Sequence, residues 1–427
     1  MNEPIFIARQ DTLEQEILPA HWLAQYKLFG EESYTFQNKE IWKKLCMSSA
    51  AANDRDIHAE ALEEMLTTFS AEHTGKWMLL VYGMDAAALE GLATMAAIAA
   101  NGTAMGAIVD NALLMHAIAN SETAMQRIAN SQTAMQRVAN NRGAMDAIGR
   151  SRIARDAVQA SPYYNSYIKE NDMAIAKLAV ALANLESAGY SGMAGVAADS
   201  TAMTAVAASA TAMTAVAASS VARNAISASP YYDEKIKEND MAIAKLVVGF
   251  ANLESAGYSG MAGVAADSTA MTAVAASSTA MTAVAASGVA LKAIAQAYKN
   301  TANMLQFLKA VNASDTLIKR IYSTLMGATG LFGATQLGSQ DGVESANSWA
   351  TTSAAPNAFL ACACGYYSSG GSSVNVTYNG TVIAQNKTGA KQPGSVTSTN
   401  VNAITMAPST FTENGDGWLA VQKFTAK

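Results

Sequence analysis

Few residues of this chain have the type and spacing for acid–base or nucleophilic chemistry. All four histidines lie at or before His116. His58 and Glu60 are two positions apart in a segment that reads as a helix, so they lie on different faces. The sequence contains no HExxH zinc motif, no GxSxG elbow and no glycine-rich phosphate loop after a strand. We interpret these residues as surface polar groups, and we expect neither an enzyme nor a bound cofactor.

Two pairs near the C-terminus offer other chemistry. Glu413 and Asp416 are the kind of carboxylate pair that glycoside hydrolysis uses, but they lie in Glu-Asn-Gly-Asp-Gly, a composition typical of a turn. Cys362 and Cys364 would project from one face of a strand, as a metal or redox pair would. Two small buried side chains are the simpler interpretation. The chain has three cysteines in all, too few for a disulfide framework.

Methionine recurs with a strict period of ten residues. It occupies every tenth position from Met95 to Met145, and an Ile or Val follows three positions later. The same decapeptide returns twice, at Met193, Met203, Met213 and at Met261, Met271, Met281. Metal binding by these thioethers is the less favoured interpretation, because methionine at apolar helical spacing belongs to a core. Such periodicity is typical of stacked structures in which each unit buries its apolar residues against its neighbours.

The decapeptide does not suit a straight helix. Ten residues advance about 1000°, roughly 80° short of three full turns, so a methionine stripe would wind quickly around the axis. Two solutions remain: an overwound helix in a left-handed supercoil, or a chain that breaks every ten residues. Ser, Asn and Thr at each junction are cap and turn residues. We therefore favour short helices that are joined by turns and stack.

A longer module interrupts the decapeptides. It begins at Ser161-Pro-Tyr-Tyr164 and restarts 68 residues later at Ser229-Pro-Tyr-Tyr232. Its first part has heptad-like spacing, and a seam between copies of the chain or a core within one chain would produce the same pattern. The residues of the predicted oligomer seam are Ile168, Asn171, Ile175, Leu178 and Leu182, with Ile236, Asn239, Ile243 and Leu246 in the second copy.

The two ends of the chain differ from the repeats. Asp54 to Phe69 has the pattern of an amphipathic helix within an acidic segment, residues 1–90, whose net charge is −8 from fifteen acids and seven bases. Helical character returns after residue 298, with a stop and a new helix start at Asn312-Ala-Ser-Asp315, and ends by Gly333. From 334 the chain is rich in Ser, Thr, Gly and Asn. Asn379-Gly380 between alternating runs predicts a β-hairpin, and Trp418 to Phe424 a closing strand.

The predicted fold is therefore mixed and mainly α. We expect an elongated repetitive helical shaft followed by a C-terminal antiparallel β domain, sandwich-like in form. The expected parts are an N-terminal domain (1–90), a decapeptide shaft (91–160), two 68-residue modules (161–297), a helical neck (298–333) and the β domain (334–427).

Composition limits the partners. The net charge is −6 and there is no basic tract, so a nucleic-acid partner is not expected. Ser200–Ala222 and Ser268–Leu291 lack charges and are long enough to span a bilayer. They consist mainly of Ala, Ser and Thr, so we do not expect membrane insertion. The first residues do not resemble a signal peptide. In the β domain, aromatic residues interleaved with Gly, Ser and Asn suit contact with a sugar or protein; the candidates are Trp349, Tyr366, Tyr367 and Trp418.

The layout resembles bacteriophage tail-fibre and related virion appendage proteins. The resemblance rests on the repeats Ser-x-Thr-Ala-Met-x-Ala-Val-Ala-Ala, the Asn-Asp-Met-Ala-Ile-Ala-Lys-Leu segments and the β tail, and it covers about residues 91–427. It implies attachment to a tail or collar protein of the virion through residues 1–90. It also implies a shaft, a tip that touches a glycan or protein of the host surface, and a homo-oligomer, usually a trimer. The heptad composition instead favours a dimer.

Three functions follow as hypotheses. The first is a structural and adhesive virion fibre (tail fibre, collar fibre or whisker), made in the host cytoplasm and assembled into the virion. The second is a bacterial surface adhesin. The third, less favoured, is a polysaccharide-degrading spike that would use Glu413 or Asp416.

Overall fold

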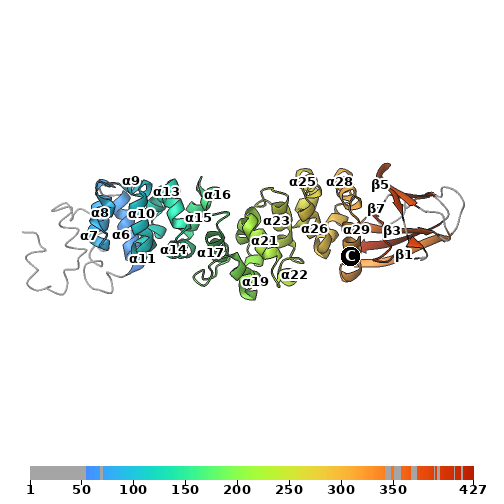
Figure 1. Cartoon of the computed structure of the whole chain (residues 1–427), viewed down its shortest axis with the longest axis horizontal. Coiled ribbons are helices and arrows are strands. Elements are labelled where there is room, and N and C mark those ends of the chain that lie inside the picture. Colours follow the sequence, from blue (N-terminus) through green and yellow to red (C-terminus); the bar gives the residue numbers. More distant parts are fainter. Residues whose placement is uncertain are drawn as a thin grey trace, which may run out of the picture. The chain divides into compact units, whose positions relative to one another are not determined.

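The computed structural model describes residues 54–67, 71–341, 348–350, 357–366, 373–388, 390–391, 395–407, 409–414 and 417–427. It divides into two compact units, Met1–Ala205 and Val206–Lys427 (Figure 1). This division does not coincide with the limits predicted at residues 160, 297 and 333. The described part is mainly helical and ends in antiparallel sheets, which confirms the predicted fold class.

The first unit consists of short helices. They are α6 (Arg55–Thr67), the 3-10 helix η2 (Ala71–His73), α7 (Thr74–Tyr82), α8 (Ala86–Leu89), α9 (Met95–Ala100), α10 (Gly102–Asp110), α11 (Ala112–Asn120), α12 (Glu122–Ala129), α13 (Gln132–Ala139), α14 (Arg142–Arg150), α15 (Arg152–Ala160), α16 (Tyr164–Tyr167), α17 (Asp172–Leu182) and α18 (Met193–Ala197). Helix α19 (Ser200–Ala208) crosses the division between the units.

Each decapeptide is a separate helix because one or two junction residues end a helix and begin the next. Ser121 has an extended backbone (φ −95°, ψ 119°); its N–H donates to Ile118, and its hydroxyl accepts from the N–H of Ala124. Asn111 does the same one repeat earlier. Helices α10 and α11 consequently meet at 102°. The prediction of short stacked helices is confirmed for the described repeats, and the overwound helix is wrong.

The apolar positions of each repeat form the inside of the stack. In the first run a decapeptide helix packs against the third helix after it: α10 contacts α13, α11 contacts α14 and α12 contacts α15. Met125 and Ile128 have no exposed surface, and neither do Met135 and Val138. Three helices therefore complete one turn of the stack, and methionine serves as a core residue that fills the space between turns.

Successive turns are also joined by a regular hydrogen bond. The hydroxyl of Ser131 donates to the carbonyl of Ala99 at 2.6 Å, and that of Ser151 to Ala119 at 2.6 Å. Each spans 32 residues. The junction side chain accepts from its own helix and donates to the turn before. The repeated serine thus satisfies a backbone donor that a helix start leaves open and an acceptor in the adjacent turn.

The first described helix, α6, packs against the beginning of this stack. Helix α6 packs against α11 and α12, with Leu62 and Met65 fully buried, as its amphipathic pattern predicted. The Glu63 carboxylate accepts from the hydroxyl of Thr123 at 2.6 Å and from its N–H at 3.1 Å. An acidic group at the start of α12 is favourable for the helix dipole.

The heptad-like residues do not form a seam between chains. Asn171 is the cap of α17, because its side chain accepts from the N–H of Ala174, so no continuous helix carries three heptads. All the apolar members of the predicted set have no exposed surface except Leu182, which is partly buried: Ile168, Ile175, Leu178, Ile236, Ile243 and Leu246. Asn239 is likewise the cap of α23 (Asp240–Phe250). These side chains already pack within one chain, so the intramolecular alternative applies and the seam assignment is corrected.

The second unit has a helical stack of the same kind. Its helices are α20 (Ala210–Ala218), α21 (Ser220–Ser227), α22 (Tyr232–Lys235), α23 (Asp240–Phe250), α24 (Met261–Ala266), α25 (Ser268–Ala276), α26 (Ser278–Ala286), α27 (Gly288–Gln296), α28 (Thr301–Asn312) and α29 (Asp315–Gly327). Helix α25 packs against α28, and α26 against α29. The segment predicted as a neck is therefore the last part of the stack, with its break at Ser314 as expected.

Two sheets follow the last helix. Their strands are β1 (Phe332–Asp341), β2 (Ser348–Ala350), β3 (Ala358–Tyr366), β4 (Ser373–Tyr378), β5 (Thr381–Thr388), β6 (Ala390–Lys391), β7 (Ala403–Met406), β8 (Ser409–Asn414) and β9 (Gly417–Ala426). One sheet has the order β1-β9-β3-β6, with β7 also paired to β3; the other has the order β2-β8-β4-β5. All pairs are antiparallel except β3 with β6.

The hairpin and the closing strand follow the sequence prediction. Asn379 and Gly380 both have positive φ, 48° and 74°, and they join β4 to β5. Strand β9 includes Trp418 to Phe424 and pairs with β1 on one side and β3 on the other. Residues of both sheets share one core with α28 and α29. Asn312 donates to the carbonyl of Ile404 at 2.6 Å and accepts from its N–H at 3.0 Å, so the last helices and the β domain form one packed body.

Candidate functional site

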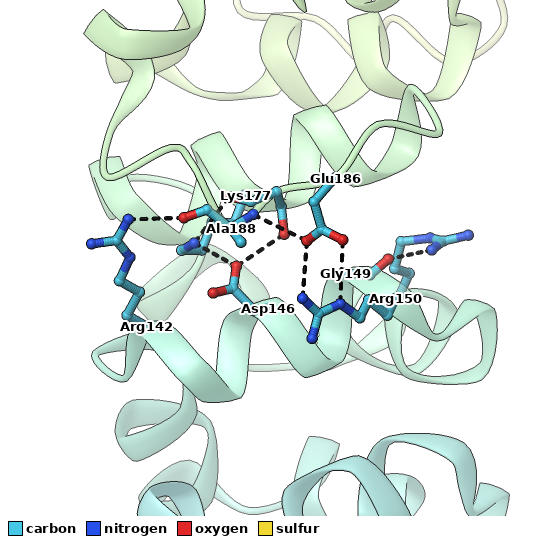
Figure 2. A network of polar contacts seen from close by, with 9 residues as sticks. Arg142, Asp146, Gly149, Arg150, Lys177, Glu186 and Ala188 are labelled. Atoms are coloured by element: carbon cyan, nitrogen blue, oxygen red, sulfur yellow. Dashed lines mark hydrogen bonds and ion pairs between the residues drawn. The ribbon is translucent and has the colours of Figure 1, made fainter. Parts of the chain in front are cut away.

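The most concentrated polar cluster of the described chain surrounds Lys177 (Figure 2). Lys177 lies on α17 with no exposed surface. Its Nζ lies 2.5 Å from Oδ1 of Asp146 on α14 and donates to the carbonyl oxygen of Ser187 at 3.0 Å. The Ser187 hydroxyl donates to the same Asp146 oxygen at 3.0 Å. A buried ammonium is costly unless it is paired and hydrogen-bonded, and this one is both.

The stack brings these groups together. Helix α17 is the third helix after α14, so the two lie against each other. Asn171 donates to the carbonyl of Ala139 at 3.2 Å, which fixes the start of α17 on the preceding turn. After α17 the backbone turns at Asn184 (φ 59°), and the following segment returns Ser187 to the lysine. Three segments that are far apart in sequence therefore enclose one charge.

A second, more exposed layer lies beside the buried pair. Arg150 forms an ion pair with Glu186 at 3.2 Å, and Glu186 also accepts from the N–H of Ala188 at 3.2 Å. Arg142 donates to the carbonyl of Ala188 at 2.8 Å. The hydrogen bond from Arg150 lowers the pKa of Glu186, with smaller contributions from the Ala188 N–H and nearby positive charge. The Glu186 side chain is 59% exposed, so solvent screens this pair strongly.

A cavity of about 320 Å³ borders the cluster. Its lining residues are Gly149, Arg150, Arg155, Ala181, Asn184, Leu185, Glu186 and Ser187. Arg155 donates to the carbonyl of Gly149, and Arg150 already faces Glu186. The Lys177 Nζ is paired with the Asp146 carboxylate, whereas a nucleophilic lysine is typically desolvated or placed beside a like charge. The cluster is therefore suited to joining turns of the stack.

The second module contains a counterpart without the acid. Lys245 on α23 is 2% exposed and donates to the carbonyls of Ser255 at 3.0 Å and Ala256 at 3.3 Å. Thr214 occupies the position of Asp146, and Ala218 that of Arg150. Burial lowers the pKa of Lys245, and the Glu254 charge offsets part of that effect.

The candidate contact residues of the β domain are partly located by backbone register. Tyr366 on β3 is opposite Gly417 on β9. Trp418 on β9 is opposite Asp341 on β1 and Gly365 on β3. Strand β1 begins at Phe332 beside α29 and ends at Asp341, so Tyr366 and Trp418 lie at the end of the sheet remote from that helix. Trp349 lies on the other sheet, opposite Phe411. Tyr367 is outside the described residues.

The remaining chemical candidates are not brought together. His58 is buried and its Nδ1 lies 3.2 Å from the Tyr82 hydroxyl, whereas Glu60 is exposed. Glu413 lies on β8, and Asp416 is outside the described residues. In the ranges that the structure describes, no group of three His, Cys, Asp or Glu residues is arranged to hold a metal ion.

The two cysteines are fully buried in β3, as the simpler interpretation predicted. Cys364 Sγ accepts from Asn402 Nδ2 at 3.0 Å and lies 3.1 Å from the carbonyl oxygen of Lys387. Neither of them forms a disulfide. They serve as small core residues of the first sheet.

Sequence reasoning did not identify the Lys177 cluster. The available signal was a lysine within an apolar helix, Ala-Ile-Ala-Lys-Leu, repeated in both modules. A charge at a core position predicts a specific buried partner. Asp146 lies 31 residues earlier, so only the three-helix turn of the stack shows that it is that partner.

Within the described ranges no single helix has both the length and the apolar composition to cross a membrane. Three pairs of consecutive helices satisfy the test only when taken together, and each pair is bent by 100° or 102°. In comparisons with known proteins, no family model and no curated protein matches this chain.

Proposed function

We propose that this protein is a structural fibre of a virion, with a helical repeat shaft and a host-contacting β domain. The supporting observation is the use of the polar side chains. The buried lysine cluster and the junction serines connect one turn of the stack to another. The same geometry recurs from repeat to repeat, and such regular stacking suits a structural spacer.

The β domain supports a contact role at the end of the chain. Its strand pairing brings Tyr366 and Trp418 to the end of the sheet remote from α29. Aromatic residues beside Gly, Ser and Asn are the composition of adaptable recognition surfaces. We propose that this end contacts a glycan or protein of the host surface, and that residues 1–90 attach to a tail or collar protein. The proposal includes assembly as a homo-oligomer, which the resemblance to tail-fibre proteins suggests is a trimer.

The proposal is tested first by shape and mass. Sedimentation velocity and electron microscopy of the purified chain should show an extended homo-oligomer, and a compact monomeric globule would contradict it. Antibodies raised against residues 334–427 should label the free ends of virion appendages. Labelling of the virion body alone would contradict the assignment of the tip.

Binding is tested with point variants because truncation would expose the core shared by α28, α29 and the sheets. A fluorescent form of the chain should bind host cells. Changing Tyr366 and Trp418 together to alanine should reduce binding at least tenfold, whereas Val382→Ala, an exposed position in β5, should not. Equal binding by both variants would place the contact elsewhere.

A further inference from the structure

The two 68-residue modules, 161–228 and 229–296, share one hydrogen bond to the helices that precede them. They differ at twelve positions. Asn171 donates to the carbonyl of Ala139, and Asn239 to that of Ala207, both at 3.2 Å and both across 32 residues. Each module is therefore placed by the same hydrogen bond on the third helix before it.

Three contacts or turns inside the modules also correspond. Tyr190 donates to Asp199 at 2.9 Å, and Tyr258 to Asp267 at 2.9 Å. The turn residues Asn184 and Asn252 have φ values of 59° and 57°. The two lysines both donate at 3.0 Å to the serine carbonyl ten residues later. These geometries are close enough for one module to stand where the other does.

The first decapeptide run provides every group that the second module needs. Removal of residues 161–228 would join Ala160 to Ser229 and keep the Ala-Ser-Pro-Tyr-Tyr junction. The Ala139 carbonyl would then accept from Asn239, as it does from Asn171. Lys245 would meet Asp146, an acid that it lacks in the natural chain, and Glu254 would meet Arg150.

The end of the second module is different because it supports the β domain. Leu291 on α27 has no exposed surface and belongs to the core that includes β3 and β9. A Cβ on Gly288 would lie 3.0 Å from side-chain atoms of Ala328 and Leu331. The first module has Arg223 and Ser220 at these two positions. Arg223 donates to the carbonyl of Ala217, so in the place of Leu291 it would bring a charged group with a single carbonyl acceptor into that apolar core.

We infer that residues 161–228 are a removable length unit of the stack, whereas residues 229–296 are a terminal unit matched to the β domain. The chain can thus lose a module between its two ends without any change to either end. In a fibre this would set the reach of the β domain, and that consequence alone rests on the proposed function.

Two deletions of equal size test the inference in the full chain. Deletion of 161–228 should give soluble protein with the helical circular dichroism signal per residue unchanged and a melting temperature within about 5 °C of the natural chain. Deletion of 229–296 should lower the melting temperature by more than about 10 °C or give insoluble protein. The changes Ser220→Gly and Arg223→Leu, added to this second deletion, should restore most of the loss.

Each half of the inference has its own contradicting result. Unfolding of the 161–228 deletion would overturn the removable unit. Equal stability of the two deletions, or no rescue by the two substitutions, would overturn the terminal unit. None of these results depends on binding, so they are distinct from a failure of the fibre proposal.

Discussion

Lys177 and Lys245 occupy equivalent positions on equivalent helices, yet only Lys177 has an acid beside it. Both are buried and both donate to the serine carbonyl ten residues later. Asp146 completes the first site, while Thr214 stands at its place in the second and donates to the carbonyl of Ala210 instead. The backbone carbonyls of the turn are therefore common to both sites, and the carboxylate is an addition at one of them.

The comparison shows what positions a buried lysine in this stack. If the ion pair with Asp146 determined where the lysine side chain lies, the side chain of Lys245 would have to lie in a different place. The turn after the helix, with its left-handed asparagine, provides acceptors in both modules. The charge of Lys245 nevertheless remains without a carboxylate at hydrogen-bond distance, and burial lowers its pKa accordingly.

The largest effect is expected from removing the acid of the first site. Asp146→Ala leaves a fully buried ammonium with one carbonyl acceptor, so we expect a loss of about 3–5 kcal/mol in the free energy of unfolding. Denaturant unfolding followed by circular dichroism measures it. The matched control is Thr214→Ala, which should cost less than about 1 kcal/mol. Similar losses for both would show that Asp146 does not stabilise Lys177.

The second largest effect on stability is expected at a close contact between two helices. Ala181 of the first module faces Gly149 on the preceding turn, and Gly249 of the second module faces Ala217 on the turn before it. A Cβ on Gly249 would lie 2.3 Å from the backbone oxygen of Ala217, which cannot move aside. Gly249→Ala should therefore cost about 1–3 kcal/mol by overpacking.

The reverse change at the equivalent position is the control for that prediction. Ala181→Gly should cost only about 1 kcal/mol, the price of glycine in a helix. Thermal unfolding compares the two variants, and an equal effect would mean that the two modules do not differ in helix separation.

A smaller, opposite effect is expected when the second site receives an acid. Thr214→Asp should stabilise the fold by about 1 kcal/mol at neutral pH through a charged hydrogen bond to Lys245. Thr214→Asn, which has the same shape without the charge, should not. A destabilising Thr214→Asp would indicate that the second site cannot accommodate a carboxylate.

The pH dependence sharpens this prediction. The pKa of Lys245 is lowered in the folded state, so between that value and about 10.4 the unfolded chain binds more protons. The contribution of this group to stability should consequently rise with pH across that alkaline window. In Thr214→Asp the rise should diminish or reverse, which unfolding experiments at a series of pH values would detect.

The smallest effect is expected in the exposed layer. Hydrogen bonding to Arg150 lowers the pKa of Glu186, so its contribution is present above the unfolded value and is lost as pH falls through the folded one. Glu186→Gln should cost less than about 1 kcal/mol at pH 7 and nothing at pH 2. Glu254→Gln is the control, because Ala218 replaces the arginine there. A loss that persists at pH 2 would exclude the ion pair as its cause.

Local features of the sequence predicted the elements well. Ser and Asn at each junction indicated where helices start, and Asn379-Gly380 indicated the hairpin. The partners of a helix were not predictable in the same way, because bends such as the 102° between α10 and α11 bring the third helix after it, as well as the next one, into contact with it. The spacing of Ile168, Ile175 and Leu178 consequently suggested a seam between chains, although those residues pack within one. The Lys177 cluster was missed for the same reason.

The reach of the hydrogen bonds has a consequence for how the chain is made. In the stack the bonds between turns close after 32 residues, as from Ser131 to Ala99. Hydrogen bonds between the last helices and the β domain join residues much farther apart in sequence. Asn312 and Ile404 are separated by 92 residues, and Tyr322 and Gln422 by 100. Local contacts form quickly and distant ones slowly. During synthesis at about 5–20 residues per second, each turn of helices can close within seconds of leaving the ribosome. The sheet of β1, β3, β6 and β7 cannot be completed before its central strand β9 is made, so the folded stack is in place before the β domain is complete.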